Sequence, residues 1–171
     1  MIVLSGGTLL LGFVTAQRLA ELWWAKRNEA RLFAAGGIEH GRSHFPLIVL
    51  LHSSWLAGMW LLAYDQPVAP AFLALFVVLQ VARCWILATL GRRWTIHVIV
   101  VPGERLIRRG PYRFMRHPNY AVIAAEIATV PLALGLPLYA VVFSILNAAV
   151  LAIRIAAENA ALAPLKRSED Q

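Results

Sequence analysis

Four polar side chains stand close together where a basic segment meets an apolar run. They follow the turn at Gly110–Pro111, and they are Arg116, His117, Asn119 and Tyr120. Cationic and hydrogen-bonding groups at the start of a helix, together with the free backbone N–H groups of its first turn, favour an anionic ligand. This segment therefore predicts a binding site for a charged group at the edge of an apolar helical hairpin.

A second pair of charged residues falls near the end of the last apolar run. Arg154 and Glu158 are four residues apart, so they share one face of a helix. If the runs 118–136 and 137–157 pack antiparallel, Arg154 lies level with His117. The predicted site then combines both parts of the chain and contains His117, Asn119, Tyr120, Arg154 and Glu158.

The elements that position these side chains are long apolar runs. The 171-residue chain is 60% hydrophobic and only 15% charged, whereas soluble domains carry about 25% charged residues. Runs of this length match the roughly 20 residues of a transmembrane helix, and they cover 2–24, 46–64, 68–90, 118–136 and 137–157. We expect an all-α, polytopic integral membrane protein of about five transmembrane helices in a single domain, residues 1–171, whose last two helices form a hairpin.

The basic residues are distributed unevenly between the connections. The net charge of +7 would suggest nucleic acid as a partner of a soluble protein, but Lys and Arg gather after the first, third and fifth runs, and the other two connections have none. The positive-inside rule then places the amino terminus outside and the carboxyl terminus in the cytoplasm. Most of these residues are explained by topology and by contact with anionic membrane lipids, so we expect no nucleic-acid partner.

The residues that commonly bind metals form no recognisable pattern. The five histidines show no paired helical spacing, and Cys84 is the single cysteine. One cysteine allows neither an intramolecular disulfide nor a cysteine cluster. We therefore predict no metal site.

Two charged residues lie inside the apolar runs, where unpaired charge is costly. Arg83 and Glu126 fall at similar depths, which predicts an ion pair between them, shared with His52, Gln80 or Asn147. Such a pair could hold the bundle together, or it could form the wall of a polar substrate pocket to which Glu126, Arg83 and His52 contribute. The sequence leaves both readings open.

The two polar elements together resemble a known family pattern. Gly110–Arg113 leads into Arg116–Tyr120, and Arg154–Glu158 follows after a helical hairpin. This combination resembles the isoprenylcysteine carboxyl methyltransferase (ICMT) family over about residues 90–163. The resemblance implies an integral-membrane enzyme that uses S-adenosyl-L-methionine, with residues 1–90 forming helices 1–3 and residues 91–163 forming the catalytic half.

The resemblance also implies roles for single residues. Arg116, His117 and Tyr120 match the segment that binds the cofactor, to which we add Asn119, and Arg154 and Glu158 match the pair associated with catalysis or substrate placement. The second glutamate of the family is Asn159 here. The whole chain, with Arg27–Glu29, Gly36–Glu39 and Gly91–Trp94, looks more like the short bacterial branch whose members methylate alkylresorcinols or alkylpyrones. We therefore expect a lipophilic small-molecule acceptor.

The expected reaction is O-methylation of a carboxylate, phenol or enol by an enzyme of the bacterial inner membrane, with the site facing the cytoplasm. A carboxylate is already ionised, and Arg154 would only orient it. A phenol or enol could require a general base, for which Glu158 and Glu126 are candidates, although Glu158 could equally hold Arg154. The alternatives are a membrane NADPH-dependent reductase of sterol-reductase type, a noncatalytic lipid-binding protein and, within the same chemistry, phospholipid N-methylation.

Overall fold

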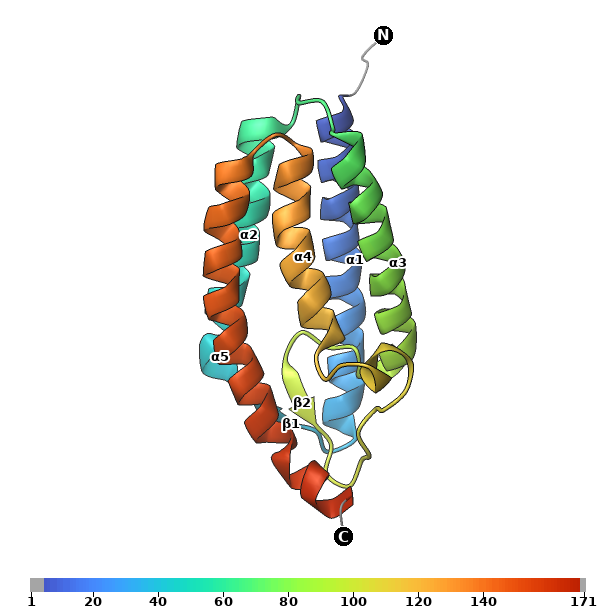
Figure 1. Ribbon diagram of the computed structural model, residues 1–171. Coiled ribbons are helices and arrows are strands. Elements are labelled where there is room, and N and C mark those ends of the chain that lie inside the picture. The colour runs from blue at the N-terminus through green and yellow to red at the C-terminus, as the bar shows by residue number, and fades with distance from the viewer. Residues whose placement is uncertain (1–4, 170–171) are drawn as a thin grey trace.

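Five long helices lie side by side in the computed structural model, which describes residues 5–169 (Figure 1). Residues 2–4 of the first expected span lie outside this range. The helices are α1 Gly6–Ala34, α2 Phe45–Ala63, α3 Pro70–Leu90, α4 Pro118–Ala133 and α5 Pro137–Glu169. The expected all-α fold with a closing hairpin, α4 and α5, is confirmed.

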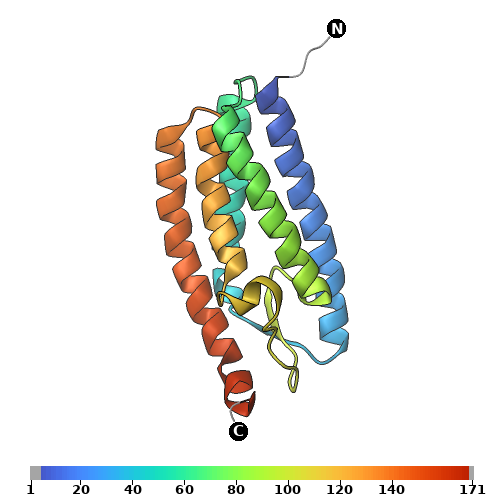
Figure 2. The same ribbon diagram turned by 45° about the vertical axis from the view of Figure 1, so that its right-hand side comes forward.

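Three segments of the described chain are long and apolar enough to cross a membrane on their own, namely Arg42–Ala63, Pro70–Arg93 and Pro137–Leu165. Large apolar side chains such as Leu61 and Leu138 point outward and are exposed, which is the surface that lipid tails solvate. The 16-residue α4 packs mainly against α3 and α5 and is seen between its neighbours in both views (Figures 1 and 2). The chain is an integral membrane protein.

Helix starts agree better with expectation than helix ends do. Pro118 begins α4 with His117 at its N-cap, as the sequence predicts. In contrast, α1 continues to Ala34 and α5 to Glu169, beyond the expected ends at 24 and 157. An apolar run marks the part of a helix that lies in lipid, whereas the helix itself can continue through residues of high helix propensity. α1 ends shortly before Gly36, and α5 continues past Pro164.

The two basic connections contain strands that the sequence does not predict. β1 (Ile38–His40) pairs antiparallel with β2 (Val98–Val100). β2 makes up half of the apolar stretch 96–101, which is too short to cross a membrane. Gly36 and Gly41 flank β1 with φ values of 82° and 68°, a region open to glycine at little cost, so α1 ends here. Both strands lie at the end of the bundle where α5 finishes (Figure 1).

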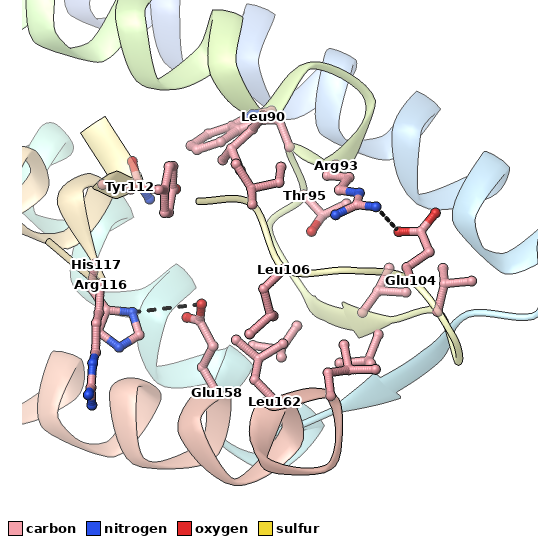
Figure 3. A pocket seen from close by; sticks show the side chains of 18 of the residues that line it. Leu90, Arg93, Thr95, Glu104, Leu106, Tyr112, Arg116, His117, Glu158 and Leu162 are labelled. Atoms are coloured by element: carbon pink, nitrogen blue, oxygen red, sulfur yellow. Dashed lines mark ion pairs between the residues drawn. The ribbon is translucent and has the colours of Figure 1, made fainter. Parts of the chain in front are cut away.

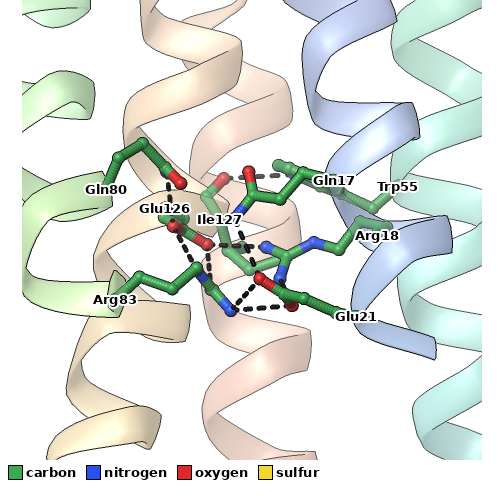
Figure 4. Close-up of polar contacts among 8 residues, drawn as sticks. All are labelled: Gln17, Arg18, Glu21, Trp55, Gln80, Arg83, Glu126 and Ile127. Atoms are coloured by element: carbon green, nitrogen blue, oxygen red, sulfur yellow. Dashed lines mark hydrogen bonds and ion pairs between the residues drawn. The ribbon is translucent and has the colours of Figure 1, made fainter. Parts of the chain in front are cut away.

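A polar network crosses the middle of the bundle (Figure 4). As predicted, Arg83 pairs with Glu126: its Nε donates to Oε1 at 2.8 Å, and its Nη2 contacts Oε2. Gln80 donates to Glu126 Oε1 at 2.8 Å, and Arg18 donates to Oε2 at 2.6 Å. Oε2 of Glu21 accepts a hydrogen bond from Nη1 of Arg83 at 3.0 Å. Two arginines and two glutamates thus tie α1, α3 and α4 together with their charges balanced.

Of the three residues expected to share this ion pair, only Gln80 does so. The Nδ1 atom of His52 lies 2.9 Å from the Ile48 carbonyl of its own helix, which satisfies the ring locally. Asn147 is buried and its Oδ1 has no hydrogen-bond partner. The predicted sharing with one of these three residues is met by Gln80, whereas the His52 ring lies against a carbonyl one turn back in its own helix.

Candidate functional site

A cavity of about 560 Å³ opens at the basic end of the bundle. Its walls come from the start of α4, the C-terminal half of α5, β2 and the connection between β2 and α4 (Figure 3). The cavity is lined by all six side chains expected at the site: Arg116, His117, Asn119, Tyr120, Arg154 and Glu158. Arg83, Glu126 and His52 do not line it, which supports the reading in which Arg83 and Glu126 hold the bundle together.

Tyr120 links the two charged residues of α5. The Nε atom of Arg154 donates to the Tyr120 hydroxyl at 2.9 Å, and this hydroxyl donates to Glu158 Oε2. The guanidinium also lies 5.7 Å from the centre of the Tyr120 ring. A second donor of Arg154, Nη2, binds the carbonyl of Ile96. The guanidinium is therefore held from two sides by the protein itself.

His117 completes the group from the start of α4. Its ring stacks on Tyr120 with centroids 5.4 Å apart. Its Nδ1 lies 3.8 Å from Glu158 Oε1, as Figure 3 shows, and its Nε2 lies 3.3 Å from Asn159 Oδ1. The His117 and Glu158 side chains remain 17% and 24% exposed, so both can be reached from the cavity.

The register between α4 and α5 differs from the expected one. Arg154 contacts Tyr120 rather than His117, and His117 lies against Glu158 and Asn159. Side chains on a helix tilt toward its N-terminus. In an antiparallel hairpin those tilts are opposed, so residues that meet lie further from the turn in α5, or nearer to it in α4, than their Cα levels suggest.

Asn119 and Arg116 occupy different parts of the wall. The Oδ1 atom of Asn119 is buried and has no hydrogen-bond partner. Arg116 is exposed and precedes the helix. Asn119 therefore has an unused acceptor within the wall, and Arg116 offers an exposed positive charge.

Comparison with known proteins now fixes the family. A model of the Isoprenylcysteine carboxyl methyltransferase (ICMT) family matches residues 72–164. The chain belongs to the ICMT family. The match extends from α3 into α5 and contains every residue of the group around Tyr120, whereas α1 and α2 lie outside it. The protein is accordingly a membrane methyltransferase.

Two relatives of this ICMT-family chain carry no assigned activity. One is the "Uncharacterized protein YpbQ" of Bacillus subtilis (strain 168), which is 38% identical over 90% of this chain and 95% of its own length. The other is an "Uncharacterized protein" of Haemophilus influenzae, 24% identical over 89% of this chain and 92% of its own. No solved structure matches the chain significantly.

Some lining residues of the ICMT-family site were given no role in it from the sequence. Trp94 and Tyr112 add aromatic surface, and Arg93 pairs with Glu104 at 2.7 Å across the cavity from His117 (Figure 3). Burial, and then the Glu158 carboxylate, raise the pKa of Tyr112 above its ordinary value, so this phenol stays neutral. Only the motif Gly110–Arg113 drew attention to Tyr112, and nothing in the spacing of Arg93 and Glu104 distinguishes them from other loop charges.

Proposed function

We propose that this protein transfers a methyl group from S-adenosyl-L-methionine to an oxygen of a hydrophobic, lipid-like acceptor. The observation that carries the proposal is the group formed by His117, Tyr120, Arg154 and Glu158. These four residues converge on one cavity at the end of a membrane-embedded bundle, in a chain of the ICMT family. The acceptor class follows from the apolar surroundings and from the arginine at the centre of the site.

The residues present fit the proposed cofactor. A volume of about 560 Å³ falls within the roughly 300–1,000 Å³ of small-molecule sites. The unused acceptor of Asn119 suits an amino group, and Arg116 suits a carboxylate. The rings of Tyr112 and Trp94, which line the cavity, can attract a sulfonium cation through their π faces. When bound, the cofactor supplies an activated methyl group.

The protein's part in such a transfer is mainly to place the acceptor and exclude water, since the reaction is an in-line displacement. Within the described residues, Arg154 donates from Nε to the Tyr120 hydroxyl and from Nη2 to the Ile96 carbonyl, and Nη1 donates to none of their side chains or backbone groups. We propose that Nη1 binds the acceptor oxygen. A carboxylate acceptor is already ionised, so it would need no general base.

A phenol or enol acceptor has a proton to lose. Tyr120 donates to Oε2 of Glu158, while Oε1 faces His117 at 3.8 Å and is only loosely engaged. We propose that Oε1 of Glu158 accepts the proton. In the carboxylate case the same residue would hold Tyr120, and through it Arg154, in position.

We place the basic end of the bundle at the cytoplasmic side of the bacterial cell membrane, following the positive-inside rule. The cofactor would enter from the cytoplasm and the acceptor from the bilayer. The division of labour is also a proposal: residues 91–163 would supply the contacts to cofactor and acceptor, and residues 1–90 would supply helices 1–3 that support them.

Purified protein in detergent provides the test. Calorimetry compares binding of S-adenosyl-L-methionine with binding of NADPH, and labelled-methyl transfer is then followed to a long-chain alkylresorcinol, a fatty acid and an amine lipid. We expect binding of S-adenosyl-L-methionine alone and transfer to one of the oxygen acceptors. Binding of NADPH instead would favour a reductase. Binding of neither compound would reject the proposed enzymatic activity.

A further inference from the structure

A buried glutamate of α1 holds the segment that precedes β2. Glu29 is 8% exposed, and its Oε1 accepts the backbone N–H groups of Ile96 and His97, both at 3.1 Å. The same oxygen lies 2.9 Å from Nδ1 of His97. Three donors thus converge on one carboxylate oxygen, although α1 is far from this segment in the sequence.

The neighbouring residue on α1 reinforces this anchor. Asn28 is fully buried, and its Nδ2 donates to the carbonyls of Trp94 at 2.9 Å and Gly91 at 3.2 Å. Asn28 and Glu29 therefore fix the backbone between residues 91 and 97 by its carbonyls at one end and by its N–H groups at the other.

The anchored backbone is the one that Arg154 binds. The Ile96 N–H is held by Glu29, and the Ile96 carbonyl accepts from Nη2 of Arg154. Moving this residue moves the acceptor that orients the guanidinium. A contact path thus runs from Glu29 through Ile96 to Arg154, and from there to Tyr120 and Glu158.

We propose that Glu29 is a positioning residue for methyl transfer, which it serves by fixing the Ile96 carbonyl that orients Arg154. This inference rests on the proposed function. Glu29 lies outside the matched region 72–164, so the family match assigns it no role. An arginine side chain has many rotamers to lose on ordering, and a misplacement of about 1 Å can cost on the order of 100-fold in rate.

The test combines changes at both ends of the path. Glu29→Ala removes the acceptor, and Glu29→Gln keeps an oxygen that can accept the same N–H groups. Arg154→Ala and the double variant Glu29→Ala/Arg154→Ala close the cycle, and Lys26→Ala changes an exposed residue of the same helix as a control. For each, we would measure S-adenosyl-L-methionine affinity, the rate of transfer to a long-chain alkylresorcinol and a fatty acid, and thermal unfolding in detergent.

We expect Glu29→Ala to lower whichever quantity Arg154→Ala lowers, by about 10-fold or more, while Glu29→Gln stays within about threefold of the wild type and Lys26→Ala has no effect. The double variant should be no worse than Arg154→Ala, because Glu29 acts only through that residue. If Glu29 merely stabilised the fold, Glu29→Ala would lower the unfolding temperature. In the double variant, its fold loss in activity would then multiply that of Arg154→Ala.

Several results would overturn the inference. They are a Glu29→Ala protein within about threefold of wild type, losses that multiply in the double variant, an Arg154→Ala change without effect, or Glu29→Ala and Glu29→Gln proteins that both fail to fold. A wild-type protein that does not bind S-adenosyl-L-methionine would instead reject the proposed function itself, and the two failures are thereby distinguished.

Discussion

Two networks of arginine and glutamate occur in this bundle, and they differ in how much of their bonding capacity the protein itself uses. In the middle, Glu126 is 1% exposed and accepts from Arg83, Arg18 and Gln80. At the basic end, the Glu158 side chain is 24% exposed, and its hydrogen bond comes from Tyr120. The first network is closed around the Glu126 carboxylate, although Nε of Arg18 has no hydrogen-bond partner, whereas the second faces a cavity.

The difference shows that residue type alone does not mark a site in a membrane protein. Charges within a bilayer are expensive unless paired, so a closed network such as that of Glu126 is what stability requires. Glu158 and Arg154 retain free bonding positions toward the cavity, which stability does not require. Single substitutions can therefore change one network while leaving the other intact.

The largest effect is expected from Glu126→Ala, which leaves three donors without their common acceptor and an excess of buried positive charge. Removing one member of a buried ion pair costs about 3–5 kcal/mol, so unfolding in detergent should occur at a markedly lower temperature. The double variant Arg83→Met/Glu126→Leu serves as the control and should recover much of this loss. A single variant as stable as wild type would show that the middle network is dispensable.

The same kinds of change at the open network should affect activity instead. Arg154→Ala or Glu158→Ala should reduce methyl transfer about 100-fold or more, as loss of an electrostatic group in a site does, while unfolding free energy changes by about 1 kcal/mol. Rate and unfolding measured on one preparation check this. Loss of stability comparable to that of Glu126→Ala would remove the distinction between the networks.

Tyr120→Phe should have an intermediate effect, because it deletes the hydroxyl between Arg154 and Glu158 and keeps the ring on His117. We expect transfer to fall about 10-fold, in line with the loss of hydrogen bonds to charged groups. Tyr139→Phe is the matched control: its hydroxyl donates to the Trp55 carbonyl at 2.9 Å, away from the cavity. Equal losses in both variants would contradict the role of Tyr120.

The smallest effect is expected from His52→Ala, and His117→Ala provides the comparison. His52→Ala should leave cofactor affinity and transfer within about twofold of wild type, the range of changes outside a site, because His52 does not line the cavity. His117→Ala should weaken cofactor binding about 10-fold. Titration calorimetry on the two variants measures this difference in cofactor affinity. A larger loss of affinity in His52→Ala than in His117→Ala would contradict the prediction.

The sequence predicts the helices well because lipid imposes a simple pattern on them. The Arg83–Glu126 pair could also be predicted, since two charges at equal depth in apolar helices need each other. His117 at the N-cap of α4 followed from Pro118. In each case one strong local or energetic requirement leaves few alternatives.

The connections could not be predicted in the same way. β1 and β2 have three residues each, too few to show a period, and their pairing joins segments far apart in the chain. The contact of Glu29 with Ile96 likewise joins a helix to an irregular segment. Such contacts depend on the completed three-dimensional arrangement, so neither composition nor spacing reveals them.

The pairing of β1 with β2 also bears on how the molecule is made. A chain emerges from the ribosome with its amino-terminal part first, so β1 has no partner until α2, α3 and the following connection have been synthesised. Arg154 arrives later still, on the last helix. The cavity is thus completed at the end of membrane insertion, and a truncated or partly inserted chain would lack the assembled site.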